Sequence, residues 1–265
     1  MKIKLEGVMK TLLITLDIRA KDYKAETSVL KDKKSAEIVE QIDYDFSSLE
    51  NDDKNYIGIL ARAKIMDREV LKFMQKYPDC HIVSLGSGLD TRFHRVDNGK
   101  IHWYDVDFPE VIELRKKFFE ENDRVKLISK SVSDPSWAEE IQNGDKKLLI
   151  ISEGMIMYLA PEEVKKFLHI LTDHFDSFEL HLDCVPNNAV NRARRNKAVK
   201  KTKSEYLFGS SKGKEILALN PKLKQIGNIN FTDEFKNLLK GFQKIFIPLI
   251  YLFNDRLLMF TYKAE

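Results

Sequence analysis

From about residue 80 onward, short apolar runs alternate with longer amphipathic stretches. The short runs have the length and the β-branched or aromatic content of strands: HIVSLG (81–86), KIHWYDVD (100–107), RVKLISKSV (124–132), KKLLIISEG (146–154) and FELHLDCV (178–185). The stretches at 109–122 and 161–175 have helical periodicity, and Pro109 and Pro161 suit the first position of a helix. This alternation predicts an α/β fold, with a parallel sheet covered by helices on both faces.

Two further apolar runs near the C-terminal end break the alternation. KIFIPLIYL (244–252) and RLLMFTYKA (256–264) are separated by only Phe253, Asn254 and Asp255, which leaves no room for a crossover helix. We therefore predict an antiparallel hairpin there, and a mainly parallel sheet whose last strand is reversed. This architecture points away from the dinucleotide dehydrogenases.

The first 78 residues contain no strand-like run. Apolar residues recur at helical spacing through residues 51–77, which predicts one long helix. They are Ile57, Leu60, Ala61, Ile65, Val70, Leu71 and Met74. We expect a helical N-terminal cap over residues 1–78 and a core over residues 79–265, because 265 residues suffice for one large core with an appended cap.

Composition places the chain among globular proteins. Hydrophobic residues make up 43%, charged residues 32% and Gly only 11 of 265, which excludes disordered, collagen-like and membrane classes. No apolar run approaches the roughly 20 residues of a membrane span, and the N-terminal segment lacks an apolar signal core. With Cys80 and Cys184 as the two cysteines, we expect a cytoplasmic protein without disulfides or a membrane partner.

Charge is unevenly distributed, although the formal net charge is only +3. Residues 187–224 carry eleven Lys and Arg against two Glu, a basic insert of +9 that leaves −6 for the rest. Seven of the basic residues fall within 192–203, and a Gly- and Ser-rich segment at 209–213 is typical of a flexible joint. One hypothesis is a mobile basic lid that selects an acidic small molecule, and the other is a solvated helix surface. Nucleic-acid binding is disfavoured, because only Tyr206 and Phe208 could stack on bases.

The segment after the first predicted strand could bind a ligand. Gly86, Ser87 and Gly88 follow that strand directly, at the carboxyl edge where parallel sheets bind ligands, and glycines let a ligand approach the backbone. Thr91 stands where a G-x-G-x-x-G motif would have its third Gly, so a pyrophosphate cradle is not supported. A tight turn without a ligand is the alternative.

Asp107 ends the second predicted strand, 19 residues after Gly88. Doubly wound folds place an acid there to accept hydrogen bonds from ribose hydroxyls. Asp105 alternates to the same side of the strand and could serve instead, or one of the two could cap the helix that begins at Pro109. Together with the Gly turn, this acid predicts a nucleoside-containing ligand.

Glu153 lies inside the apolar run LLIISEGMIMYL, at the end of the fourth predicted strand. A carboxylate in apolar surroundings needs a partner, because an unpaired buried charge is costly. A cationic ligand or an Arg at the same edge would supply it, while a helix cap or an internal salt bridge is the alternative. The six histidines have no metal-ligand spacing, so no metal site is predicted, and hydrolase and kinase motifs are absent.

Four ordered motifs carry a resemblance to a known family. They are IVSLGSGLDTRFHR (82–95), WYDVDFPEVI (103–112), DPSW (134–137) and ISEGMIMYL (151–159), preceded by Lys10-Thr11, Arg19-Ala20 and the helix that contains Arg62. This pattern resembles the leucine carboxyl methyltransferase and polyketide O-methyltransferase family over roughly residues 8–185. The resemblance implies a Rossmann-like class I methyltransferase fold with seven strands, the last antiparallel, and S-adenosyl-L-methionine as the methyl donor.

The resemblance also implies roles for residues around the donor. The turn at Gly86, Ser87 and Gly88 would line it, and Asp107 would accept hydrogen bonds from its ribose. Ser131 and Val132 stand at the position expected to meet the adenine amino group, where many relatives have Asp-Leu. Ser131 can still accept a hydrogen bond there.

The methionine end of the donor would involve the cap. Arg62, with Lys10 beside it, would hold the methionine carboxylate, and Glu153 would lie under the amino group. Tyr158 resembles a family position that faces the acceptor, and its alternative is to pack beneath the cap.

The predicted function is O-methylation of a hydroxyl or a carboxylate of a small-molecule acceptor. Methyl transfer from a sulfonium is an in-line displacement, for which the enzyme mainly supplies alignment and a dry cavity. A carboxylate acceptor needs no base, whereas a hydroxyl acceptor must lose its proton. The alternatives are a protein C-terminal carboxylate as acceptor, a nucleic-acid methyltransferase, and a non-catalytic module that binds S-adenosylmethionine.

Overall fold

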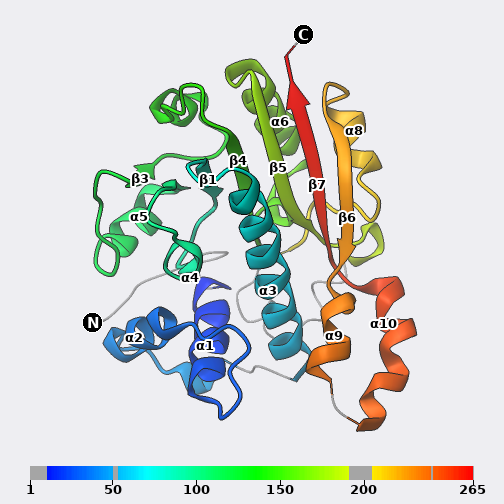
Figure 1. The fold of residues 1–265 in the computed structure, drawn as a ribbon. Coiled ribbons are helices and arrows are strands. Elements are labelled where there is room, and N and C mark those ends of the chain that lie inside the picture. Colours follow the sequence, from blue (N-terminus) through cyan, green and yellow to red (C-terminus); the bar gives the residue numbers. More distant parts are fainter. Residues whose placement is uncertain (1–10, 50–52, 191–204, 240, 265) are drawn as a thin grey trace.

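A computed structural model of the chain describes residues 11–49, 53–190, 205–239 and 241–264. Within these ranges seven strands form one sheet, in the order β3-β2-β1-β4-β5-β7-β6 (Figure 1). Five strands are parallel: β1 (His81–Leu85), β2 (His102–Asp107), β3 (Val125–Ser129), β4 (Leu148–Ser152) and β5 (Ser177–Cys184). β7 (Arg256–Lys263) runs antiparallel to both of its neighbours, β5 and β6 (Lys224–Asn230). The predicted α/β sheet with a reversed last strand is confirmed.

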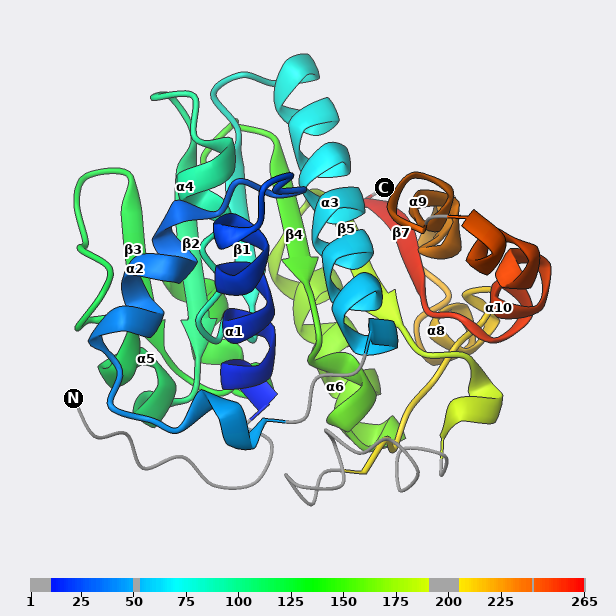
Figure 2. The ribbon, with the colours of Figure 1, turned by 90° about the horizontal axis from the view of Figure 1, so that it is seen from below.

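Helices cover both faces of this sheet (Figure 2). One face packs against α6 (Pro161–His174), α8 (Lys214–Leu219) and the 3-10 turn η3 (Pro135–Glu140). The other face packs against α3 (Asp53–Lys76), α4 (Arg92–Val96) and α9 (Thr232–Leu238). Side chains alternate between the two layers along each strand, so that Val83 and Leu85 face the first layer and Ile82 faces the second.

The described residues before the sheet are mainly helical, as predicted. α1 (Thr11–Lys24) and α2 (Lys33–Gln41) pack on each other, the 3-10 turn η2 (Phe46–Ser48) follows, and α3 lies along the sheet. Leu13, Leu16 and Ile38 of α1 and α2 are buried together with Phe118 and Phe119 of the core. The boundary at residue 78, between α3 and β1, stays a prediction.

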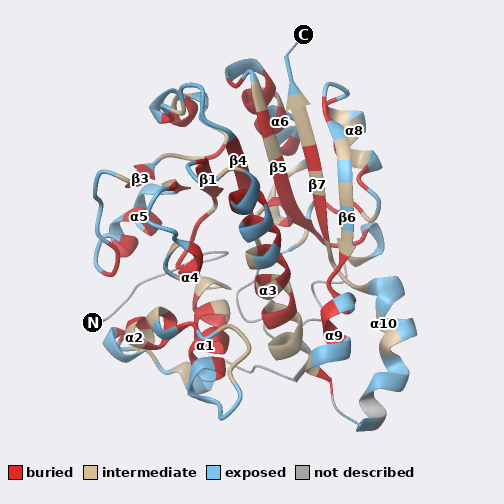
Figure 3. Ribbon diagram, viewed as in Figure 1, coloured by how far each residue is buried: buried red, intermediate tan, exposed pale blue. Residues whose placement is uncertain are grey.

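The predicted C-terminal hairpin is wrong. Residues 244–252 fall in the 3-10 turn η7 (Gly241–Phe246) and in α10 (Ile247–Phe253), a helix that is largely exposed (Figure 3). The apolar run is misleading because its side chains lie on the surface, with Ile245 75% and Leu252 67% exposed. Pro248 occupies the first turn of α10, where a missing N–H does no harm.

The strand that pairs with β7 on its outer side is β6, which the hydrophobic pattern does not reveal. Its sequence, KQIGNIN, alternates between exposed and half-buried positions because β6 forms the edge of the sheet. The half-buried positions are Gln225, Gly227 and Ile229, and only one of these is a large apolar residue, so the usual apolar alternation is missing.

Two element ends also differ from the predictions. The helix expected over 109–122 ends early, as α5 (Pro109–Arg115), and the chain then turns so that Phe118 and Phe119 pack against the cap. The strand expected over 124–132 ends at Ser129, which leaves Ser131 and Val132 in a turn.

The basic insert at 187–224 is described only in part. All seven clustered basic residues, within 192–203, lie outside the described residues, so the structure does not address the lid hypothesis. The segment at 209–213 is a packed turn rather than a flexible joint. Ser210 is fully buried, its N–H donates to the Val185 carbonyl at 2.9 Å, and its Oγ donates to Glu215 Oε2 at 2.6 Å.

Candidate functional site

A cavity of about 260 Å³ lies at the carboxyl edge of the parallel strands. The sheet contributes the turn at residues 86–88 and the end of β4, including Glu153. The cap contributes residues of α1 and α3, among them Arg62. A third group of lining residues comes from later segments: Met157, Tyr158, Tyr206, Phe231, Asn254 and Asp255. The cavity thus joins the cap, the middle of the sheet and the start of β7.

The turn after β1 has the geometry of a ligand-binding loop. Gly86 and Gly88 have φ angles of +65° and +50°, which side chains rarely adopt. An added Cβ on Gly86 would lie 2.8 Å from Met155, and one on Gly88 would lie 2.5 Å from Leu12. Ser87 Oγ is buried and has no hydrogen-bond partner among the described residues. A buried hydroxyl without a partner is rare, and a bound molecule could satisfy it.

The two carboxylates of β2 have different environments. Asp105 pairs with Arg115 (Oδ2 to Nη2, 2.5 Å) and accepts a hydrogen bond from Trp103 Nε1 at 3.0 Å, so it is committed to the core. Asp107 accepts only backbone hydrogen bonds, from the N–H of Gly88 and of Phe108, both at 2.7 Å. Of the two, Asp107 therefore keeps acceptor capacity beside the Gly turn. Burial raises its pKa to about 6, against the lowering effect of these two hydrogen bonds.

Asp107, Ser131 and Val132 do not line the cavity. Ser131 Oγ accepts a hydrogen bond from the N–H of Ser133 at 3.3 Å. Val132 is buried in the core, and its carbonyl accepts a hydrogen bond from Trp137 Nε1. The roles of these residues toward ribose and adenine remain predictions.

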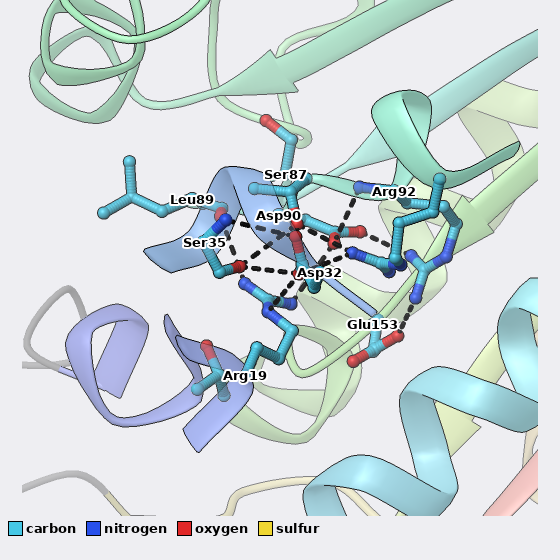
Figure 4. Close-up of polar contacts among 12 residues, drawn as sticks. Arg19, Asp32, Ser35, Ser87, Leu89, Asp90, Arg92 and Glu153 are labelled. Atoms are coloured by element: carbon cyan, nitrogen blue, oxygen red, sulfur yellow. Dashed lines mark hydrogen bonds and ion pairs between the residues drawn. The ribbon is translucent and has the colours of Figure 1, made fainter. Parts of the chain in front are cut away.

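Glu153 is held by two arginines, Arg62 and Arg92, and Figure 4 shows it beside Arg92. Arg62 Nε donates to Oε1 at 3.0 Å, and Arg92 Nη2 donates to Oε2 at 2.5 Å. The internal salt bridge anticipated as one alternative is therefore present. Arg62 also donates through Nη1 to Asp183 Oδ2 at 3.2 Å. Burial alone would lower the pKa of Arg62, but Glu153 and Asp183 outweigh it and raise that pKa.

Beneath the cavity, buried arginines and carboxylates join the cap to the core (Figure 4). Arg19 of α1 donates to Asp90 Oδ1 at 3.2 Å and to the Leu89 carbonyl at 3.1 Å. Burial alone would raise the pKa of Asp90, but Arg92, Arg19 and Arg95 outweigh it and hold that pKa well below its ordinary value. Asp90 is thus a fixed anion at the end of the Gly turn.

Two further acids extend this cluster. Arg95 of α4 pairs with Asp32 Oδ2 at 2.8 Å and with Asp67 Oδ2 at 2.7 Å. Arg92 Nε also pairs with Asp67 Oδ1, at 2.6 Å. Asp32 caps α2 and Asp67 belongs to α3, so both acids come from the predicted cap. Ion pairs therefore join the cap to α4, in addition to the apolar contacts of α3 with Val96.

Tyr158 lies in the 3-10 turn η4 (Ile156–Tyr158) and faces Tyr206, with ring centroids 5.5 Å apart in an edge-to-face contact. The N–H groups of Leu207 and Phe208 both donate to the Met157 carbonyl, which fixes this part of the insert beside the turn. Burial raises the pKa of Tyr158 to about 12. Both rings line the cavity, as the substrate-side position of Tyr158 requires.

The sequence analysis missed two acids at this edge. Asp183, in the apolar run of β5, accepts hydrogen bonds from Arg62 and from the N–H of Gly154. An acid at the end of an apolar strand was the signal that identified Glu153, and it applies equally to Asp183. Asp255 directly precedes β7. The sequence analysis did not single out Asp255 because the wrongly predicted hairpin placed it in the connecting turn. Lys10 lies outside the described residues.

Within residues 11–49, 53–190, 205–239 and 241–264, no group of three or more His, Cys, Asp or Glu side chains could hold a metal ion. Over the same described residues, no helix has the length and apolar character needed to cross a membrane.

Comparison with known proteins identifies a family. The family model for leucine carboxyl methyltransferase matches residues 15–172. The chain is 30% identical over 223 residues to the tetracenomycin polyketide synthesis O-methyltransferase TcmP of Streptomyces glaucescens, covering 84% of this chain and 82% of that protein. It is 25% identical over 156 residues to leucine carboxyl methyltransferase 1 of Candida albicans, covering 45% of this chain and 42% of that protein.

Solved structures share the fold at low sequence identity. Magnesium protoporphyrin IX methyltransferase from Synechocystis PCC 6803, solved with bound S-adenosylhomocysteine, has a TM-score of 0.52 at 9% identity, covering 88% of this chain and 96% of that one. A Thermobifida fusca structure described as a methyltransferase has a TM-score of 0.60 at 16% identity, covering 79% and 83%. With this fold, its Gly turn and its matched motifs, the chain belongs to the leucine carboxyl methyltransferase family and is an S-adenosyl-L-methionine-dependent O-methyltransferase.

Proposed function

We propose that the protein transfers the methyl group of S-adenosylmethionine to an oxygen of a small organic acceptor. The observation that carries this proposal is that one cavity contains the Gly86–Gly88 turn together with Tyr158, Tyr206 and Phe231. The turn suits the donor and the aromatic residues suit an organic acceptor, so the two would meet within one cavity. The relative with the larger shared coverage is a polyketide O-methyltransferase, which also favours a small molecule.

Some residues of the chain would bind the donor, and others would align the acceptor. The turn at 86–88, Asp107 and Ser131 would hold the adenosine part of the donor, and Arg62 would hold its carboxylate. When bound, S-adenosylmethionine supplies an electrophilic methyl group on a sulfonium. Tyr158 and Tyr206 would position the acceptor oxygen and exclude water, which contributes to the rate through orientation.

The experiment that tests this function has a binding arm and a transfer arm. Calorimetry with S-adenosylhomocysteine should give a micromolar dissociation constant, about −8 kcal/mol. Incubation with S-adenosylmethionine and a panel of hydroxy and carboxy compounds should release S-adenosylhomocysteine and give O-methyl products. Binding without transfer to any panel member would favour the non-catalytic module. Transfer to a peptide C-terminal carboxylate in preference to small molecules would favour the protein acceptor.

A further inference from the structure

The turn η7 and the helix α10 concentrate exposed apolar side chains on one part of the surface (Figure 3). Eleven large hydrophobic residues are exposed in the described part of the chain, and six of them fall within residues 245–253. These six, which are between 40% and 75% exposed, are Ile245, Phe246, Leu249, Tyr251, Leu252 and Phe253. Single exposed apolar residues are ordinary on a protein surface, whereas a contiguous group marks a contact site.

The opposite side of α10 is packed against the protein, which holds the exposed side chains outward. Ile247 and Ile250 pack against the apolar layer that α3 and α9 form on the sheet. At the other end of the helix, the Tyr251 carbonyl accepts a hydrogen bond from Asn230 Nδ2 at 2.8 Å. The Arg256 guanidinium lies 5.3 Å from the centre of the Tyr251 ring. The exposed apolar side of α10 therefore belongs to the packed fold and cannot turn inward.

The helix is apolar or aromatic on every side, which is typical of helices that are enclosed by protein. Residues 245–253 contain no Asp, Glu, Lys or Arg, although charged residues make up 32% of the chain. Helices that lie on a membrane surface combine an apolar side with a side rich in Lys and Arg. The second side of α10 is instead packed against the sheet layer, so the exposed side favours a protein partner over lipid.

The size of this apolar surface suits a symmetric dimer. From their exposed fractions, the six side chains leave roughly 600 Å² accessible, at the upper end of the range of about 300–600 Å² for the largest patch on a monomer. A standard interface buries about 800 Å² on each partner. Lys244 and Pro248 are also exposed and extend the surface toward that size. A twofold dimer uses the same surface twice, and residues without charge bring no like charges together.

We propose that residues 245–253 form a dimer interface, on which the same residues of a second copy of this chain pack. Leu249 is the central anchor of the interface. Phe246 and Phe253 follow it at helical spacing in the two directions along the chain, and aromatic residues are enriched in the cores of protein interfaces.

The interface adjoins the cavity. Asn254 and Asp255 directly follow α10, and both line the cavity. Asn254 Nδ2 donates to Thr232 Oγ1 at 2.8 Å, and the Asp255 carbonyl accepts a hydrogen bond from the N–H of Phe231 at 3.1 Å. A second copy on α10 therefore stabilises the segment that forms one wall of the site. The interface is the same whichever oxygen group accepts the methyl.

Sedimentation equilibrium of the full chain at micromolar concentrations tests the interface. The wild type should sediment at twice the 30.9 kDa of one chain. The double variant Leu249→Glu, Leu252→Glu places carboxylates in the interface and should raise the dimer dissociation constant at least about 100-fold. Leu71→Glu changes an exposed apolar residue of α3 outside the interface and is the matched control, for which the constant should not change. Circular dichroism of each variant separates loss of the interface from loss of the fold.

Hydrogen exchange of the wild type gives a readout that needs no variant. The amides of residues 245–253 should exchange more slowly at high than at low protein concentration, whereas those of α8 should exchange at the same rate. A wild type that stays monomeric, a dimer that survives in the double variant, or an equal loss in Leu71→Glu would each overturn the interface. Flotation of a monomeric wild type with phosphatidylcholine vesicles, abolished in the double variant, would assign the surface to a membrane instead.

Discussion

The N–H of Gly88 donates to Asp107 Oδ2 at 2.7 Å, which joins the turn after β1 to the end of β2. Each oxygen of Asp107 has one backbone donor and keeps acceptor capacity for a ribose hydroxyl. The variant Asp107→Ala should therefore lose about 1.5–3 kcal/mol of affinity for S-adenosylhomocysteine, measured by calorimetry. Asp105→Asn is the control: it breaks the buried pair with Arg115 and should lower stability more than affinity. The opposite pattern would show that Asp105 is the ribose ligand.

The free energy of unfolding should fall as the pH rises from about 4 to about 7. Burial raises the pKa of Asp255 to about 7 and that of Asp183 to about 6, from an ordinary value of 3.8. The folded protein therefore binds more protons than the unfolded chain in this window, which stabilises it at the acidic end. Asp255→Asn should reduce this slope and raise Tm at about pH 8. Calorimetric scans across the window check this, and an equal slope in both proteins would contradict it.

Removing Arg92 should destabilise the fold strongly. Its side chain is 1% exposed and pairs with Asp67, Asp90 and Glu153. Arg92→Ala would leave these acids short of a partner, a loss of about 3–5 kcal/mol in urea unfolding. Lys222→Ala breaks a pair with Asp173 that is more than half exposed, and should cost at most about 1 kcal/mol. A similar loss in both variants would mean that burial of the pair has no influence.

Tyr158→Phe should separate acceptor chemistry from donor binding. Because burial raises its pKa to about 12, the Tyr158 hydroxyl stays protonated at neutral pH and can position an oxygen without acting as a base. Loss of one hydrogen bond, about 1.4 kcal/mol, should lower kcat/KM for an acceptor found in the panel of hydroxy and carboxy compounds about tenfold, with S-adenosylhomocysteine affinity unchanged. Tyr104→Phe alters another buried tyrosine, which contacts His81 and does not line the cavity, and it should leave both quantities unchanged. If only donor affinity falls in Tyr158→Phe, the residue belongs to the donor site.

Methyl transfer should survive chelators. The described residues contain no cluster of metal-ligating side chains. Turnover measured before and after treatment with EDTA should agree within error. Loss with EDTA that a divalent ion restores would show that a metal is required.

The strands and their order explain why much of the site could be predicted. In βαβ units the ends of β1 and β4 meet at one edge, so Gly86, Gly88 and Glu153 converge although they are far apart in sequence. The periodicity and the length of the apolar runs sufficed to predict where these strands end. The resemblance added Arg62 and Tyr158, and both line the cavity.

Other parts depend on packing that no local pattern encodes. The apolar run of α10 has the composition of a strand, and only its tertiary position leaves it exposed. Asp255 reaches the cavity only because β7 inserts between β5 and β6. The partners of Glu153 come from α3 and α4, so the choice between a ligand and an internal salt bridge depends on how the cap docks.

The ion pairs between the helices before β1 and the arginines of α4 bear on whether the residues from β1 onward could fold without those helices. A fragment beginning at β1 would keep Arg92 and Arg95 but lose Asp32 and Asp67, their counter-charges from the helices in front. Arg92 would keep Asp90 and Glu153, but Arg95 would keep only a 3.5 Å contact with Asp90, and its buried guanidinium would be short of a counter-charge. Melting should therefore be cooperative, one transition in which the catalytic sheet and the segment in front of it are lost together.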